Sequence, residues 1–353
     1  MIIERPRENI PKFFLQWHLT TKCDYNCKHC YVKEESTYKG EVENELDTEQ
    51  CLKIIDDFIK TLKIWKIRGS INLTGGDPLL RKDIFKIIKY IRKNNIEVSI
   101  LGNSTYMNDK NIKKLDSLKL DRYQMSIDGI EDVHDDFRRK KGSFKEILKT
   151  MKLIREGSSI TPVVMSTLCK ENMNDMEKIV DYSCQNGAKL VAFARLVPIG
   201  SGKEIRDGSL SIEEFKKSFE ILSRKEREVG NKIKIGHKDP LWSLYEYEKG
   251  IFKPEKCKDC IISGCSIGWS GMSVLADGTV LPCRRLPLKI GNLSEQTIRD
   301  VFVDSTVLDE IRDVNNIEKC NGCELRSYCR GCRAVAYALK GDYLAADPHC
   351  WKE

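Results

Sequence analysis

The 353-residue sequence lacks any run of 18 apolar residues, and its first eleven residues, MIIERPRENIP, alternate in charge. A membrane-spanning helix needs about 20 predominantly apolar residues, and a signal peptide needs an apolar stretch after its basic start. The sequence therefore predicts a cytoplasmic protein with no part in a membrane.

A basic stripe is also missing. The 60 Lys and Arg residues outnumber the 53 Asp and Glu residues, for a net charge of +7, but both signs are mixed along the chain. Nucleic-acid-binding proteins gather basic residues on one face or along one helix. The mixed pattern favours a solvated, lysine-rich surface over nucleic-acid binding.

Cysteine, in contrast, is abundant, with 15 residues. Thiols stay reduced in the cytosol and bind metals there more often than they form disulfides. Residues 23–30 read CDYNCKHC, a C-x3-C-x2-C triplet of Cys23, Cys27 and Cys30 with no fourth cysteine nearby. A [4Fe-4S] cluster takes four thiolates, so three would leave one iron open to a ligand that is not protein. A zinc site completed from elsewhere is the alternative, although such sites usually pair their cysteines or add His.

Strand-like and helix-like segments alternate along the first two thirds of the chain. We expect six strands, at residues 13–20, 70–74, 97–101, 123–127, 162–168 and 190–196. Amphipathic helices are expected between or after them, at 48–65, 82–93, 143–155, 175–185 and 211–227. This order predicts an α/β fold, a partial (β/α)6 TIM-type barrel. We expect the barrel over residues 1–205 and a helical linker over 206–256.

The loops after the predicted strands share a common rim. In such barrels the carboxyl ends of the strands carry the active site. The cysteine triplet follows the first strand, Gly75-Gly76-Asp77-Pro78 the second, Gly102-Asn103-Ser104 the third and Asp128-Gly129 the fourth. Each could be an ordinary turn, but their shared position predicts a site.

The last 97 residues form a second compositional region. Nine cysteines lie there, among short Gly- and Pro-punctuated segments: Cys257, Cys260, Cys265, Cys283, Cys320, Cys323, Cys329, Cys332 and Cys350. We expect a small cysteine-rich C-terminal iron-sulfur domain over residues 257–353, stabilised by metal. The other three cysteines, Cys51, Cys169 and Cys184, lie in core-like patterns and are expected to be inert thiols.

The triplet, the Gly75–Pro78 segment and the barrel order resemble the radical S-adenosylmethionine (radical SAM) enzymes. Their C-x3-C-x-φ-C motif matches Cys23, Cys27 and Cys30, with His29 at φ. In that family the open iron binds the amino and carboxylate groups of S-adenosylmethionine (SAM), and reductive cleavage gives a 5′-deoxyadenosyl radical that abstracts hydrogen from substrate. The resemblance implies a flavodoxin or ferredoxin-type electron donor.

The resemblance also assigns SAM-binding residues. Gly75, Gly76 and Asp77 correspond to a Gly-Gly-Glu motif whose backbone and side-chain oxygens accept hydrogen bonds from the SAM ammonium, with Asp in place of Glu. Ser126 and Arg138 correspond to the groups that hold the SAM carboxylate.

The ribose and adenine contacts are assigned in the same way. Either Asn103 or Asp128 is expected at the ribose, and Arg195-Leu196-Val197 at the adenine. For Ser126 and Asn103, simple turn capping is an equal alternative.

The C-terminal cysteines resemble the SPASM extension, which binds two auxiliary [4Fe-4S] clusters. Gly278-x4-Cys283 and Cys320-x2-Cys323-x5-Cys329 match its spacing, whereas Cys329-x2-Cys332 is one residue shorter than usual. The resemblance gives one cluster Cys265, Cys283, Cys332 and either Cys260 or Cys257. It gives the other Cys320, Cys323, Cys329 and Cys350. The implied cofactors are SAM and three [4Fe-4S] clusters, with zinc as the alternative for the C-x2-C pairs.

The resemblance implies a radical SAM/SPASM oxidoreductase whose first expected substrate is a ribosomally made peptide that is crosslinked, epimerised or oxidised. The alternative is a tetrapyrrole or another small cofactor. Arg284 and Arg285 stand where anaerobic sulfatase maturases carry an acidic residue, which counts against formylglycine formation. They suit the carboxylates of an acidic leader peptide or of tetrapyrrole propionates. A non-catalytic electron carrier and a zinc module are the alternatives from a different class of function, and neither would need an open iron.

Many peptide-modifying relatives carry an N-terminal winged-helix domain, and here the first strand begins near residue 13. A separate peptide-recognition protein, or direct binding at the barrel edge, is therefore expected. The substrate and the modified residue have no signature in the sequence.

Overall fold

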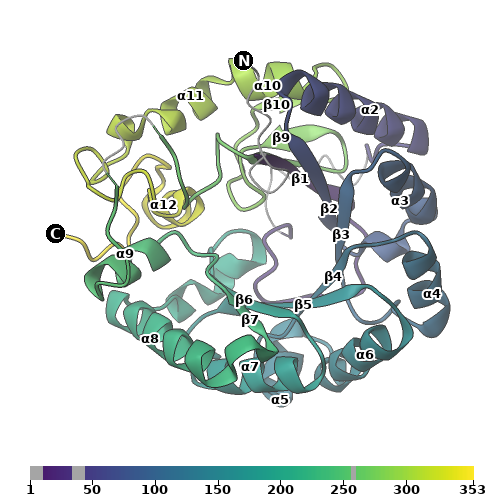
Figure 1. Cartoon of the computed structure of the whole chain (residues 1–353), viewed down its shortest axis with the longest axis horizontal. Helices are drawn as coiled ribbons and strands as arrows, with labels where there is room; N and C mark the ends of the chain where they lie inside the picture. The colour runs from purple at the N-terminus through teal and green to yellow at the C-terminus, as the bar shows by residue number, and fades with distance from the viewer. Residues whose placement is uncertain (1–10, 34–43, 256–259) are drawn as a thin grey trace.

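A curved, mainly parallel sheet forms the centre of the computed structural model, which describes residues 11–33, 44–255 and 260–353 (Figure 1). All six predicted strands are present: β1 (Lys12–Thr20), β2 (Arg68–Gly75), β3 (Glu97–Leu101), β4 (Arg122–Ser126), β5 (Thr161–Leu168) and β6 (Leu190–Arg195). They pair in parallel in chain order, which confirms the predicted partial barrel.

Alternation along β1 shows how the sheet divides inside from outside. Leu15 and Trp17 are fully buried, and they point toward the helical layer because successive strand residues face opposite sides. Gln16 lies between them and faces the barrel lumen, paired across the sheet with Asn72 of β2. Both polar residues are only partly buried, so the lumen is open rather than packed.

Helices cover the outer face of the sheet (Figure 1). They are α2 (Thr48–Trp65), α3 (Ile84–Lys93), α4 (Asp109–Ser117), α5 (Asp132–Arg138), α6 (Ser143–Gly157), α7 (Met176–Gln185) and α8 (Ile212–Val229). A capping box of Asp47 and Gln50 starts α2, and another of Ser211 and Glu214 starts α8. No helix in the described ranges is long and apolar enough to cross a membrane.

The sheet extends beyond the six predicted strands to ten. At one edge of the sheet, β7 (Lys234–Gly236) pairs in parallel with β6. At the other edge, β8 (Gly271–Val274) pairs in parallel with β1. The antiparallel strands β9 (Thr279–Leu281) and β10 (Gly291–Asn292) follow β8. These strands have only two to four residues, too few to show alternation in the sequence. The β1–β8 pair places the cysteine-rich region beside the strand that leads to the triplet.

The remaining helices are short. They are α9 (Trp242–Glu248), α10 (Ile298–Asp304), α11 (Thr306–Arg312) and α12 (Arg333–Lys340), with the 3-10 turns η3 (Pro78–Leu80), η4 (Met173–Asp175), η5 (Gly200–Gly208), η6 (Gly230–Lys232) and η7 (Val314–Asn316). The domain boundaries expected at residues 205 and 256 stay predictions.

Candidate active site

Three thiols meet in the loop that follows β1. Cys23, Cys27 and Cys30 line one cavity of about 170 Å³ at the carboxyl ends of the barrel strands. Burial raises the pKa of the Cys27 thiol, Arg138 opposes this, and the nearby Cys30 and Cys23 raise it further. The three sulfurs are thus close neighbours that a positively charged iron cluster would stabilise as thiolates.

The arrangement suits a cluster better than a single ion. Nowhere in the described residues do three or more His, Cys, Asp or Glu side chains converge on a position for one metal ion. Zinc needs its sulfurs about 2.3 Å from one centre. Three soft ligands around one cavity fit a [4Fe-4S] cluster.

Helix α5 holds the triplet loop from the outside. The backbone N–H of Lys28 donates to the Phe137 carbonyl at 2.9 Å, and the Lys28 ammonium pairs with Asp136. Arg138, at the end of α5, donates to the Cys27 sulfur at 3.6 Å and pairs with the buried Asp128. Arg138 therefore fixes the Cys27 thiol as well as lining the cavity.

Gly75 and Gly76 let the loop after β2 press against the start of the triplet loop. Gly76 N–H donates to the Thr20 carbonyl at 2.7 Å. A Cβ on Gly76 would lie 2.0 Å from the Lys22 carbonyl oxygen, and one on Gly75 would lie 2.1 Å from that of Thr20. Gly75 also has φ of 120°, which side chains rarely adopt. Both glycines line the cavity, as the sequence predicted for SAM contacts.

Asp77 differs from the expectation. Its side chain is fully buried and lies outside the cavity lining. Its two oxygens accept hydrogen bonds from the backbone N–H groups of Leu79, at 2.9 Å, and Asn103, at 3.1 Å. Burial raises its pKa to about 6. Asp is one methylene shorter than Glu and bonds its own turn, so Asp77 ties the β2 and β3 loops together and does not face the cavity.

The two ribose candidates separate in the structure. Asn103 lines the cavity, and its amide lies 3.6 Å from the Cys23 sulfur. Asp128 is fully buried outside the cavity lining, where it pairs with Arg138 and accepts from the Thr167 N–H. A buried carboxylate needs such partners, so the geometry favours Asn103.

The other predicted residues line the cavity as expected. Ser126 and Leu196 do so from the ends of β4 and β6. His29 lies on the cavity wall and stacks on Phe137, with ring centroids 4.5 Å apart. Burial lowers the pKa of His29 to about 3, and Arg138 adds to this, so the ring is neutral.

The C-terminal cysteines fall into two sets. One set lines a cavity of about 580 Å³: Cys320, Cys323, Cys329 and Cys350. The thiols of the other set pack on one apolar cluster: Cys265, Cys283 and Cys332. The pKa of Cys332 is raised to about 11, mainly by burial; Arg285 and Arg195 oppose this, and the nearby Cys265 adds to it. These cysteines lie together as the predicted grouping requires, their roles as cluster ligands stay predictions, and Cys257 lies outside the described residues.

The short Cys329-x2-Cys332 interval is explained by its backbone. Arg330 and Gly331 both have positive φ, of 62° and 58°. Two left-handed residues in succession turn the chain sharply, so that Cys329 faces one set and Cys332 the other. The Arg330 guanidinium steadies this turn by donating to the carbonyls of Ser263 and Cys265, at 2.7 and 2.8 Å.

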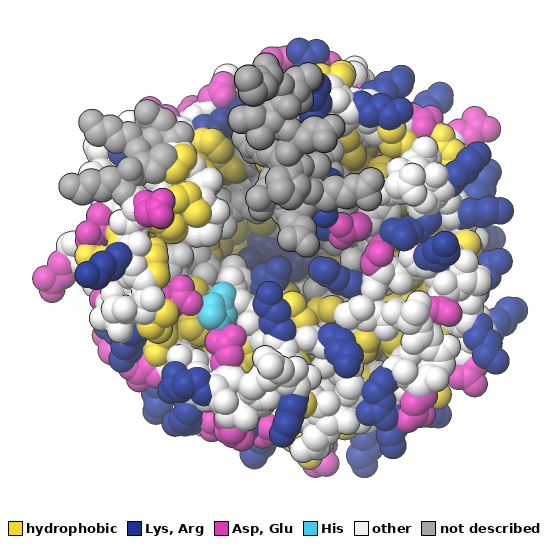
Figure 2. All heavy atoms as spheres, viewed as in Figure 1, with side chains coloured by type: hydrophobic (Ala, Val, Ile, Leu, Met, Phe, Trp, Pro, Cys, Tyr) yellow, Lys and Arg dark blue, Asp and Glu magenta, His cyan; other side chains and the backbone are white. Residues whose placement is uncertain are grey.

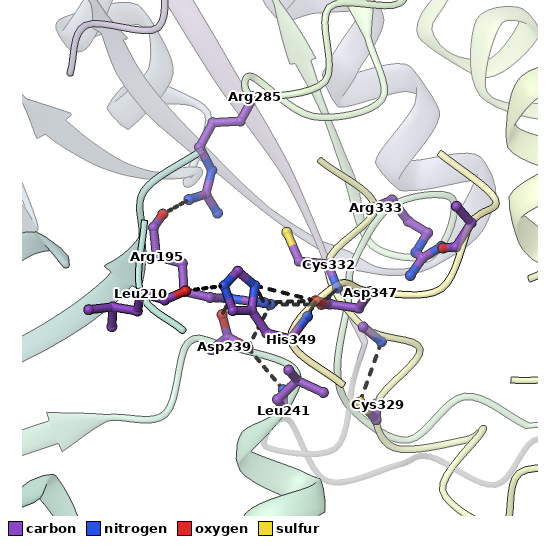
Figure 3. Close-up of polar contacts among 12 residues, drawn as sticks. Arg195, Leu210, Asp239, Leu241, Arg285, Cys329, Cys332, Arg333, Asp347 and His349 are labelled. Carbon is purple, nitrogen blue, oxygen red and sulfur yellow. Dashed lines mark hydrogen bonds and ion pairs between the residues drawn. The ribbon is translucent and has the colours of Figure 1, made fainter. Parts of the chain in front are cut away.

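Arg195 joins the barrel to the cysteine-rich region (Figure 3). Its backbone end lies on the cavity of the cysteine triplet, but its side chain is buried and turns away to pair with Asp239 and Asp347, at 2.7 and 2.8 Å. Asp347 in turn accepts from the Cys332 N–H at 2.7 Å, and His349 Nδ1 lies 3.0 Å from Arg195. The sequence placed Arg195 only at the adenine, because its partners are 44 and 152 residues away.

Basic and aromatic side chains close the cavity on the side of the cysteine-rich region. Arg284 and Arg285 line it together with Tyr31, and the Arg284 guanidinium lies 5.7 Å from the Tyr31 ring centroid. Arg285 donates to the Arg195 carbonyl at 3.2 Å (Figure 3). Tyr31 approaches the buried His18 at 3.1 Å. The sequence offered no signal for His18 or Tyr31.

Comparison with known proteins matches residues 17–183 to the radical SAM superfamily and residues 265–324 to SPASM, an iron-sulfur cluster-binding domain. The chain is also 30% identical over 347 residues to an AdoMet-dependent heme synthase of Methanosarcina barkeri (strain Fusaro / DSM 804), covering 97% of both chains. This chain belongs to the radical SAM enzymes with a SPASM domain. It therefore binds SAM and iron-sulfur clusters and catalyses a radical reaction.

Two other proteins extend the comparison. The antilisterial bacteriocin subtilosin biosynthesis protein AlbA of Bacillus subtilis (strain 168) is 25% identical over 324 residues, which are 90% of this chain and 66% of AlbA. The crystal structure of Streptococcus suis SuiB bound to S-adenosylmethionine superposes with a TM-score of 0.77, at 17% identity, covering 97% of this chain and 78% of SuiB. The fold is thus shared with SuiB.

Proposed function

We propose that this radical SAM/SPASM enzyme acts on a carboxylate-bearing side chain of an iron porphyrin. The observation that carries the proposal is the pair Arg284 and Arg285, which face the same cavity as the cluster thiols. Guanidinium groups bind carboxylates bidentately, and heme-type porphyrins carry propionates. The end-to-end similarity to a heme synthase supports this choice.

Three [4Fe-4S] clusters are part of the proposal. Cys23, Cys27 and Cys30 would hold the one that binds SAM, and the two C-terminal sets would hold the others, with Cys257 or Cys260 as the fourth ligand of the set that contains Cys265. When bound, SAM and the first cluster supply the 5′-deoxyadenosyl radical. A flavodoxin or ferredoxin-type protein would supply the electron.

The chain's own residues would bind and orient SAM and the substrate. Gly75, Gly76, Asn103 and Ser126 would hold SAM against the triplet loop. Arg284 and Arg285 would fix a substrate carboxylate on the opposite wall. The Arg195 carbonyl accepts from Arg285, so that guanidinium keeps one orientation. A neutral His29 beside the cluster adds no charge to the cavity.

A ribosomally made peptide, expected first from the sequence, is the second candidate, and the similarity to AlbA favours it. The same arginines would then bind acidic side chains of the peptide, with or without a separate recognition protein. The cytoplasmic location stays a prediction under either candidate.

The test compares substrates on anaerobically reconstituted enzyme with dithionite. An iron porphyrin with four propionates is expected to increase 5′-deoxyadenosine formation above the rate without substrate, and an acidic peptide is not. Arg284→Ala and Arg285→Ala should each weaken porphyrin binding about 10- to 100-fold, the loss of a hydrogen-bonded charge pair.

Arg299→Ala is the matched control, because Arg299 is exposed on α10. It should behave as the parent enzyme. Stimulation by the peptide and not by the porphyrin would replace the first candidate with the second. Equal losses for Arg284→Ala and Arg299→Ala would remove the arginines from substrate binding.

A further inference from the structure

Basic side chains continue from the SAM cavity down the barrel lumen. Lys234 of β7 pairs across the sheet with Leu190, which belongs to the row Leu101, Gln124, Val163 and Leu190. Leu101 and Gln124 of this row line the SAM cavity. Cross-strand partners share a face of the sheet, so Lys234 points into the lumen at the level of the cavity floor.

Arg122 lies one row lower. It is two residues before Gln124 on β4, and alternate strand residues share a face, so it also points into the lumen. Its cross-strand partners are Ser99 and Thr161, which are neutral. Arg122 and Lys234 are both exposed although they face inward, which shows that the lumen is open at this level.

Lys238 completes the group. It follows β7 in a tight turn, in which its N–H donates to the Gly236 carbonyl at 3.0 Å. The next residue, Asp239, is clamped by Arg195 and also accepts from the Leu241 N–H (Figure 3). This clamp fixes the backbone that carries Lys238.

The charged groups that shift the pKa of Lys238 are all cations. Burial lowers its pKa, and Arg122, Lys234 and Arg284 lower it further. Within the described residues no carboxylate forms an ion pair with Lys238, Arg122 or Lys234. Glu97, at the start of β3, is already paired with Lys12 at 2.5 Å. Figure 2 shows Lys and Arg side chains gathered around and within the central hollow.

We propose that Lys238, Arg122 and Lys234 form a carboxylate-binding site in the barrel lumen. The site holds a second carboxylate of the substrate while Arg284 and Arg285 hold the one beside SAM. Arg284 lowers the pKa of Lys238, so the two groups of cations are electrostatic neighbours. A porphyrin with carboxylates on separate edges of its ring matches such a divided surface. The assignment of the ligand rests on the proposed iron-porphyrin substrate; the site itself does not.

Two probes test the site on the reconstituted holoenzyme. The first is benzene-1,2,4,5-tetracarboxylate, followed by calorimetry, and the second is the iron porphyrin with four propionates, followed by absorbance. Lys238→Gln should weaken the binding of both about 5- to 30-fold, and Lys238→Arg should restore it. Binding to the parent enzyme should weaken as salt is raised.

Lys217→Gln is the matched control, because Lys217 is exposed on α8, one of the helices on the outer face of the sheet (Figure 1). It removes the same charge and should bind both probes as the parent does. Iron content and circular dichroism check that each variant folds. Benzene tetracarboxylate affinity that is equal for Lys238→Gln and the parent would overturn the site. A tetracarboxylate difference with no porphyrin binding by the parent would leave the site standing and overturn the porphyrin substrate.

Discussion

Replacing Arg195 should lower the free energy of unfolding, because its side chain joins the barrel to the cysteine-rich region. Its side chain is 3% exposed, and its carboxylate partners Asp239 and Asp347 are 8% and 1% exposed. Burial would raise the pKa of Asp347, yet Arg195 holds it far below its usual range. Arg195→Met keeps much of the volume but leaves two buried carboxylates unpaired. Breaking a buried pair in this way costs about 3–5 kcal/mol.

Anaerobic urea unfolding, followed by circular dichroism, measures that loss. Arg224→Met is the control, since Arg224 and Glu177 form an ion pair at 61% and 41% exposure, where the expected cost is about 0–1 kcal/mol. Combining Arg195→Met with Asp239→Asn and Asp347→Asn should recover part of the loss, because the uncompensated charges are gone. Equal unfolding free energies for Arg195→Met and Arg224→Met would refute the reasoning.

Three further predictions follow from the site and its surroundings. Gly76→Ala should abolish SAM cleavage and lower iron content, because its Cβ would meet the Lys22 carbonyl at 2.0 Å, whereas Gly157→Ala, with open space around it, should retain both. The hydrogen bond with Glu246 raises the pKa of His237, burial opposes this and Glu226 adds to it. Relative to the parent, His237→Gln should therefore lose most stability below about pH 6.5. The pH-dependent part of the difference in unfolding free energy should vanish as pH rises past the raised pKa. A difference in unfolding free energy that stays constant from about pH 5.5 to 8.5 in urea unfolding would contradict this. Iron analysis should give about twelve irons per chain, and about eight after Cys23, Cys27 and Cys30 are all changed to Ala; a total near four would reject the two auxiliary clusters.

The predictable part of the fold is the part with local patterns. Alternation around Leu15 and Trp17 and the capping box at Asp47 locate β1 and α2 from the sequence alone. Strand β8 has four residues and pairs in parallel with β1 more than 250 residues away along the chain, so no local pattern announces it. The extension of the sheet into the cysteine-rich region therefore needed the structure.

The candidate site also has a part that the sequence predicted and a part that only the structure shows. Motif spacing predicted the three thiols of the triplet loop, which line one cavity, and both C-terminal sets, because spacing is a property of the chain. It predicted SAM contacts for Asp77 and, as one of two candidates, for Asp128, whereas their carboxylates contact backbone N–H groups and Arg138 and lie outside the cavity lining. The Arg195 clamp and the lumen lysines depend on partners from distant strands, which only the folded chain brings together.

The most direct test of the account is the transfer of hydrogen from the porphyrin. An iron porphyrin deuterated on its propionate methylenes is incubated anaerobically with the reconstituted enzyme, SAM and dithionite, and 5′-deoxyadenosine is analysed by mass spectrometry. We expect one deuterium in the 5′-deoxyadenosine formed by the parent enzyme, and none with Cys23, Cys27 and Cys30 changed to Ala. Undeuterated 5′-deoxyadenosine from the parent, formed at the same rate with and without the porphyrin, would contradict the proposed function.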